Sequence, residues 1–359
     1  MVVTNRDSGD LTLIDSRSDQ IVGRIPLAQG ASPHMSMVAH NGTRVVATET
    51  GLNEVAIADL ATRTVVARIP VGRGPEHFDL SPDGRFAYIG NFEGDSLSII
   101  DLEQAKEVAR LDGFFEPHGI TATSNGKVYV SNFGAHELGI VDTQRQTVVA
   151  KLAVAETPRL AAFNPLLQLT DIKGVANPTA TIDGRFLYMA DGDAGTVAVV
   201  DTQSDRVINT IAVGAEPWRA YASPDGRWML VPNNGDETVA VLDAARHRLQ
   251  TELKTGPGVT GVNFTQDGRK AYVIASGERA VYVYDLRALA LVKRIPFEVT
   301  ATLETATTTP DGRKIYLASS TNNTVYVIHT DDETVTSIRE VGQSPWGTNM
   351  LGSHDNYCH

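Results

Sequence analysis

The sequence has almost no cysteine. Cys358 is the only one in 359 residues, so no disulfide can form within the chain. There is also no run of 18 apolar residues, and no membrane-spanning segment is therefore predicted. No signal peptide is visible, and the opening residues "MVVTNRDSG" already follow a strand-like pattern, as those of a mature domain with a new start methionine would.

Positive charge is scarce as well. The chain has 31 Lys and Arg residues against 43 Asp and Glu residues, a net charge of −12. An acidic surface repels phosphate backbones, so nucleic acid is not an expected partner. The hydrophobic content of 42% is typical of a globular protein with a buried core.

Helical periodicity and the common catalytic signatures are missing too. The apolar residues alternate with period 2 throughout, which is typical of strands. No nucleophile elbow, phosphate-binding glycine loop or dinucleotide fingerprint occurs. The sequence therefore predicts an all-β protein.

What the chain does contain is a repeat. Asn-Gly or Asp-Gly turns between alternating apolar runs, a strong hairpin signal, recur at spacings of 42, 42, 58, 42, 42 and 44 residues. They end at Gly42, Gly84, Gly126, Gly184, Gly226, Gly268 and Gly312. A second marker is an apolar run that ends in Asp, for example at Asp59, and we expect this Asp to cap the following turn.

Each repeat reads as four short strands, as in "EHFDLS", "RFAYIGN", "SLSIID" and "KEVARL". Four-stranded units of this length are typical of β-propeller blades. Seven third strands end in Asp and an eighth ends in His329 at the same place, whereas the turn occurs only seven times, which indicates one split blade. The N-terminal "VVTNR", "LTLID" and "QIVGRIP" and the C-terminal "WGTNML" would complete it. We therefore predict a single eight-bladed propeller domain over residues 1–359.

The phrases "YVSNFG", "AVVDTQSDRVINTIAVG" and "SPDGRFAYIGN" resemble the YVTN family of β-propeller repeats over nearly the whole chain. Members of that family include surface-layer proteins, cofactor-binding domains and enzymes. Many are exported, so the resemblance implies a periplasmic or extracellular location. The architecture is also similar to the eight-bladed haem d1 domain of nitrite reductase, whose cofactor is held by histidine in the channel.

Two segments fall outside the repeat. The spacing of 58 indicates an insertion over residues 155–178, on the face where the first strand of each blade begins. It is either a tolerated surface loop or a packed lid or oligomer contact. The tail, residues 352–359, holds His354, Cys358 and His359. A plain tail, a separate metal site and a reactive thiol all remain open for it.

The histidines gather at one repeat position. His34 and His118 lie eight residues before their turn glycines, and His77 lies one residue later than that position, which Glu76 occupies. A bulge or bend at the strand start would let His77 point inward; otherwise Glu76 does. Three imidazoles suit Cu, Zn, Fe or Ni, and we predict a metal site there, with His136 as a further candidate ligand. The alternative is that these histidines only hydrogen-bond to water or backbone in a wet channel.

The other blades carry a different set at this position. Trp218, Arg219 and Trp346 occupy the equivalent ring, and Arg159 lies where the insertion begins. Aromatic and guanidinium groups suit an anionic or planar substrate, although large side chains also simply fill a channel. Glu304 and Glu76 are candidate general acids or bases.

Two functions remain open. The first is a metal-dependent oxidoreductase or lyase that acts on a small anionic or aromatic substrate at the channel mouth. The second is a non-catalytic module that binds a partner protein or carries a metallocofactor such as haem d1. Fold alone does not decide between them.

Overall fold

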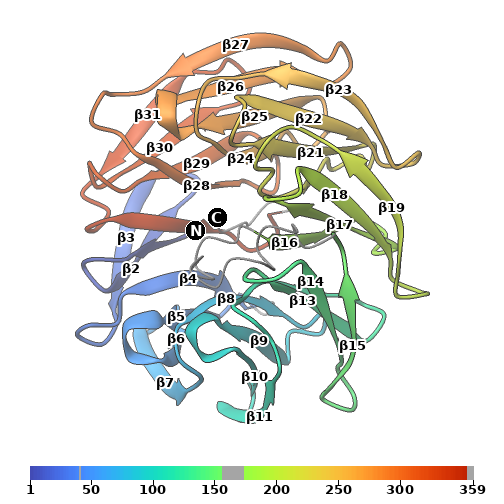
Figure 1. The fold of residues 1–359 in the computed structure, drawn as a ribbon. Helices are drawn as coiled ribbons and strands as arrows, with labels where there is room; N and C mark the ends of the chain where they lie inside the picture. The colour runs from blue at the N-terminus through green and yellow to red at the C-terminus, as the bar shows by residue number, and fades with distance from the viewer. Residues whose placement is uncertain (40–41, 156–173, 354–359) are drawn as a thin grey trace, which may run out of the picture. The chain divides into compact units, whose positions relative to one another are not determined.

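The computed structural model describes residues 1–39, 42–155 and 174–353. These residues form eight four-stranded antiparallel sheets, the blades of an eight-bladed β-propeller (Figure 1), as predicted. Most of the insertion and the end of the tail lie outside the described residues. No helix in the described ranges is long and apolar enough to cross a membrane.

The chain divides into two compact units with four blades each. Unit one comprises Met1–Glu76, Gln104–Lys106 and Gly258–His359, and unit two comprises His77–Glu103 and Glu107–Pro257. The division falls within two strands of one blade, between Glu76 and His77 in the strand Pro75–Leu80 and between Lys106 and Glu107 in the strand Lys106–Asp112.

The strands of unit one form the first two and the last two blades along the chain, counting the split blade as the first. They are β1 (Val2–Asn5), β2 (Asp10–Asp15), β3 (Gln20–Pro26), β4 (Pro33–Val38), β5 (Arg44–Glu49), β6 (Glu54–Asp59), β7 (Thr64–Pro70), β24 (Val259–Phe264), β25 (Lys270–Ala275), β26 (Ala280–Asp285), β27 (Ala290–Pro296), β28 (Leu303–Thr308), β29 (Lys314–Ser319), β30 (Thr324–His329), β31 (Val335–Arg339) and β32 (Pro345–Asn349). Two short 3-10 turns are η1 (Thr50–Leu52) and η4 (Ser276–Glu278).

The strands of unit two form the four blades in between. They are β8 (Pro75–Leu80), β9 (Phe86–Asn91), β10 (Ser96–Asp101), β11 (Lys106–Asp112), β12 (Pro117–Ala122), β13 (Lys127–Asn132), β14 (Glu137–Asp142), β15 (Thr147–Ala153), β16 (Val175–Ala180), β17 (Phe186–Asp191), β18 (Thr196–Asp201), β19 (Arg206–Ala212), β20 (Tyr221–Ala222), β21 (Trp228–Asn233), β22 (Thr238–Asp243) and β23 (Arg248–Lys254). One short 3-10 turn, η2 (Phe92–Gly94), follows β9.

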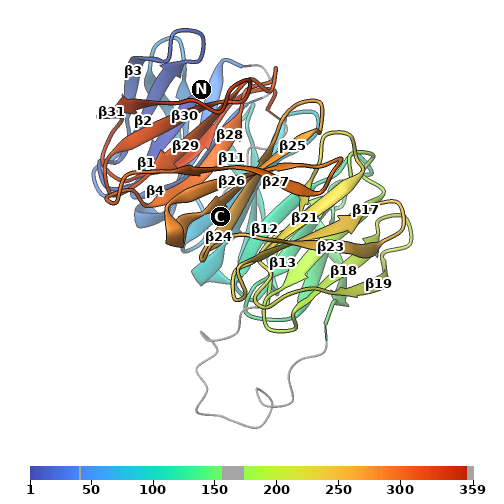
Figure 2. The ribbon, with the colours of Figure 1, turned by 90° about the horizontal axis from the view of Figure 1, so that it is seen from above.

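The split blade joins the two ends of the chain. Its strand order is β3-β2-β1-β32, and Val3 of β1 pairs with Thr348 of β32. Figure 2 shows β1, β2 and β3 of this blade together with β28 to β31 of the preceding one. The pairing predicted from the unequal counts of turns and third strands is confirmed, and it removes an open sheet edge.

The predicted turns form as expected. Each of the seven turn glycines has a positive φ, for example +70° at Gly84 and at Gly312, a conformation that glycine adopts without the steric cost of a Cβ. The Asp that ends seven of the eight third strands caps the next turn, and His329 stands at that place in β30. Asp59 Oδ1, for instance, accepts the backbone N–H groups of Ala61 and Thr62 at 3.0 and 2.8 Å.

The first strands carry a register shift near their beginning. In β12, Pro117 pairs with Asn132 and Ile120 with Val130, so His118 and Gly119 together oppose Ser131. The same two-against-one arrangement occurs at the pairs His34–Met35, Ala176–Asn177 and Glu304–Thr305. A β-bulge of this kind bends the strand and breaks the strict alternation of side chains.

Neighbouring blades are fastened by a repeated polar contact. Tyr316 of β29 donates to Asp19 Oδ1 at 2.5 Å, and Asp19 lies in the turn between β2 and β3. Lys314 Nζ reaches the same carboxylate at 2.8 Å. The equivalent groups are Lys127, Tyr129 and Asp205 in unit two, and Lys270 and Glu333 in unit one. We call this arrangement the blade latch.

The latch yields a stability prediction. Tyr316→Phe removes a donor and leaves a partly buried carboxylate short of a hydrogen bond, so we expect the free energy of unfolding to fall by about 1–2 kcal/mol in urea titrations. Tyr88→Phe is the matched control, because Gln146 stands at the turn position that Asp19 occupies. Its expected effect is within about 0.5 kcal/mol. Equal losses in the two variants would contradict the assigned role of the latch.

Candidate functional site

Unit two brings two of the predicted histidines together with three aromatic rings. The ring centroids of His77 and His118 lie 3.9 Å apart. His118 also lies 5.5 Å from Phe133, 5.9 Å from Trp218 and 6.1 Å from Phe92. We call these five residues the histidine–aromatic cluster. Both histidines are buried, whereas the three aromatic rings are only partly buried.

The bulge of β12 places His118. A Cβ on the neighbouring Gly119 would lie 2.5 Å from the carbonyl oxygen of Ala176, so only glycine lets β16 approach this closely. That carbonyl oxygen lies 3.2 Å from His118 Nδ1 and also accepts the Ser131 hydroxyl at 2.5 Å. A carbonyl can only accept, so Nδ1 carries the proton and Nε2 carries the ring's lone pair.

The electrostatics keep His118 neutral. Burial lowers the pKa of His118 to about 4, and the positive charge of Arg219 acts in the same direction. The hydrogen bonds with Ala176 and with the Asn177 side chain oppose the shift without cancelling it. A neutral imidazole is the form that binds a metal.

Arg219 flanks the cluster, next in the chain to its member Trp218. Arg219 forms a parallel bridge with Asn177, and its Nε donates to Thr179 Oγ1 at 3.3 Å. The guanidinium also lies 5.7 Å from the ring centroid of Tyr221. Trp218 meets Phe133 edge to face at 5.7 Å. The cluster and the adjacent Arg219 thus combine imidazoles, flat apolar surface and one positive charge.

Unit one contains a second group of predicted residues. The metal-capable atoms of His34 and Glu76 lie within 4.8 Å of each other, and the same limit holds between Glu76 and His77, the next residue of β8. In a regular strand two consecutive side chains point to opposite faces, so the start of β8 departs from that alternation. The His34 ring also lies 5.9 Å from that of Trp346.

Trp346 and Glu304 complete this group. The Arg6 guanidinium covers the Trp346 ring at 5.1 Å. Glu304 is buried and accepts the Ser320 hydroxyl at 2.5 Å. Burial raises the pKa of Glu304, although the Ser320 hydrogen bond and the charge of Arg6 oppose the rise.

The sequence analysis did not find every residue of these groups. Phe92 and Phe133 follow the second strands of the two blades that also carry His77 and His118, and the shared pair "NF" was the available signal. No pattern in the sequence pointed to Arg6. Of the predicted site residues, Arg159 lies outside the described part of the chain. His136 is buried and bonded to Asp191, and its role as a metal ligand stays a prediction.

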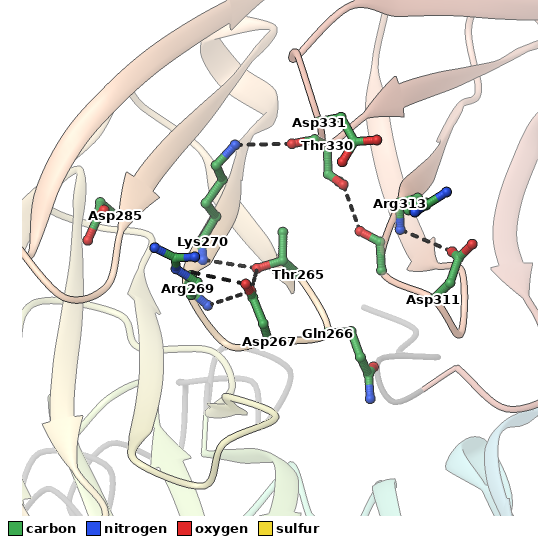
Figure 3. A pocket seen from close by; sticks show the side chains of 11 residues that line it. Thr265, Gln266, Asp267, Arg269, Lys270, Asp285, Asp311, Arg313, Thr330 and Asp331 are labelled. Carbon is green, nitrogen blue, oxygen red and sulfur yellow. Dashed lines mark hydrogen bonds and ion pairs between the residues drawn. The ribbon is translucent and has the colours of Figure 1, made fainter.

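A cavity of about 600 Å³ in unit one lies elsewhere (Figure 3). It is lined by residues of the turns β24–β25 and β28–β29, such as Asp267 and Asp311, and by no predicted site residue. Its polar groups already bond to one another: Asp267 accepts from Arg269 N, and Lys270 Nζ donates to Thr330 O. These contacts stabilise the turns, and none of them points to a ligand.

The fold and the cluster define an eight-bladed propeller with a histidine-bearing, aromatic-lined site. A family model of YNCE-like β-propellers matches residues 27–355, and the chain belongs to that family. The resemblance to propeller repeat proteins is therefore confirmed.

Individual relatives are more distant. The chain is 24% identical over 238 residues to "Protein NirF" of Pseudomonas aeruginosa, and the match spans 60% of this chain and 56% of that relative. Among solved structures it is similar to "Dihydro-heme d1 dehydrogenase NirN in complex with DHE", with a TM-score of 0.78 at 17% identity over 98% of this chain and 75% of that one. Kuenenia stuttgartiensis hydrazine synthase gives a TM-score of 0.61 at 19% identity, over 87% of this chain and 96% of that one. At such identities the likeness shows the fold.

The shifted pKa of His118 predicts acid sensitivity. Between the unfolded value of about 6.5 and the folded value of about 4, only the unfolded chain binds the proton, so stability is complete above this window and is lost as the pH falls through it. We expect the free energy of unfolding to drop by about 2 kcal/mol from pH 7 to pH 5 through this residue. Urea titrations of the wild type and of His118→Gln at both pH values measure the difference. An equal pH dependence in both proteins would contradict the prediction.

Proposed function

We propose that this chain binds an iron tetrapyrrole of the haem d1 type, with the histidine–aromatic cluster as its site. The observation that carries the proposal is His118, a buried imidazole with its Nδ1 proton bonded to Ala176, beside His77 and three aromatic rings. The similarity to a dihydro-haem d1 dehydrogenase supports the choice of ligand class.

The residues present fit such a group. A tetrapyrrole is flat and largely apolar, and the partly buried rings of Phe92, Phe133 and Trp218 offer faces and edges for it to contact. Its carboxylates suit the charge of Arg219. Either His118 or His77 would hold the iron, and the low pKa of His118 means that protons compete little for its lone pair. The bound iron would supply redox chemistry and an open coordination position.

A second candidate is a single transition-metal ion on His34 and Glu76, as in the metal-dependent oxidoreductase or lyase expected from the sequence. The short separation of their metal-capable atoms favours it. Imidazole and carboxylate ligands suit Zn, Fe, Cu or Ni. This candidate requires tight binding of a metal ion without a tetrapyrrole. For either function, the family resemblance supports a location in the periplasm or outside the cell.

The test is a titration of the purified full chain with haem d1, followed by visible absorption. We expect stoichiometric binding and a shift of the bands on coordination by histidine. His118→Ala or His77→Ala, whichever removes the axial ligand, should lower the affinity at least tenfold, about 1.4 kcal/mol, and change the spectrum.

His247→Ala is the matched control, because this histidine bonds to Tyr188 in a turn between the outer strands and not in the cluster. It should leave affinity and spectrum unchanged. If both cluster variants bind haem d1 with the wild-type spectrum and affinity, the proposed site is wrong. Uptake of one free metal ion per chain that His34→Ala abolishes would favour the second candidate.

A further inference from the structure

The loop between β13 and β14, residues 133–136, is held by backbone hydrogen bonds within unit two. Phe133 N donates to Glu116 O at 3.0 Å, and Gly174 N donates to Phe133 O at 3.1 Å. A Cβ on Gly174 would lie 2.4 Å from Ala135 O, so the loop packs directly on the chain that enters β16. Side chains of this loop therefore have fixed positions.

His136 of this loop forms a buried pair with Asp191. Its Nδ1 is hydrogen-bonded to Asp191 Oδ2, and each of the two side chains is only 2% exposed. The other oxygen of Asp191 accepts Ala194 N at 2.9 Å. The carboxylate thus fixes the orientation of the imidazole and raises its pKa, which favours a proton on both ring nitrogens.

The burial of the second ring nitrogen of His136 is not explained by the pair with Asp191. His136 Nε2 is buried and has no hydrogen-bond partner among the residues that the structure describes. An unsatisfied buried donor is unfavourable, and native proteins rarely retain one without a reason. An N–H group that Asp191 orients in this way is suited to donate a hydrogen bond to an anionic oxygen.

The pair lies beside the histidine–aromatic cluster. Asp191 pairs in register with Val175, and the next residue, Ala176, accepts the hydrogen bond from His118. Phe133, from the same loop as His136, contacts the His118 ring. Asp191 is therefore paired with Val175, the residue of β16 that directly precedes the hydrogen-bond partner of His118.

We propose that His136 Nε2–H donates a hydrogen bond to a carboxylate of the ligand bound at the cluster. His136 is then a recognition residue that selects free-acid tetrapyrroles, and not the metal ligand expected from the sequence. This inference rests on the proposed function, since it concerns the same bound molecule. Asp191 is a positioning residue that acts through His136.

The test compares haem d1 with its fully methyl-esterified form, in which the carboxylates are blocked. We expect the wild type to bind the free acid at least tenfold more tightly than the ester. His136→Leu should lose most of this preference while the iron absorption spectrum stays unchanged. His136→Gln, which keeps an N–H donor, should restore part of it. Asp191→Asn keeps the shape of the pair and should reduce the preference, and His247→Gln is the control without effect.

The outcomes separate the two proposals. If the wild type binds neither form, the proposed function fails and this inference with it. If the wild type binds both forms equally, or if His136→Leu weakens both equally, the cluster site stands and the role of His136 is overturned. A His136→Leu protein that is less stable in urea but keeps the full preference shows a structural role only, which also overturns the inference.

Discussion

The bulge at the start of the first strands is the constraint on which the rest of the site depends. In a regular strand consecutive side chains point to opposite faces of the sheet, so of two neighbouring residues only one would face the candidate site. Where two residues oppose one, that alternation is interrupted, and a polar residue such as His118 or Glu304 is placed at the shift. In β12 the shift is tolerated for two reasons. The Ser131 hydroxyl accepts the displaced backbone N–H of Gly119, and Gly119 has no Cβ that would keep β16 away.

That close approach also decides the chemistry of the cluster. The same Ala176 carbonyl that meets Ser131 fixes the proton of His118, and the packing that brings it there removes water from the ring. Burial is then the largest cause of the low pKa of His118, and the charge of Arg219 adds to it. A basic, solvated histidine at the same position would be protonated for much of the time near neutral pH and would bind iron less readily.

Much of the fold follows from the sequence, and less of the site does. Turn glycines and capping Asp residues are local signals, so blade number and the split blade are predictable from their spacing. The proline before His34 and His118 marks the start of a strand, so each histidine takes the same position within its own blade. The partnership of His136 with Asp191 joins residues 55 positions apart in different blades, and no local pattern encodes it. The low pKa of His118 depends on its burial in the folded protein, which no short segment of the sequence encodes either.

Comparison of the blades distinguishes residues that recur for the sake of the fold from residues that differ between blades. The turn caps recur with the same chemistry in seven blades and the blade latch at three junctions, because neighbouring blades pose similar packing problems. At the first-strand position eight residues before the turn glycine, the residues differ between blades and include histidine, glutamate, alanine, tryptophan and threonine. Packing alone does not require such variety, since any residue of suitable size would fill the position. The asymmetry agrees with the proposed ligand, because the histidine–aromatic cluster and the adjacent Arg219 together offer nitrogen donors, flat rings and a guanidinium.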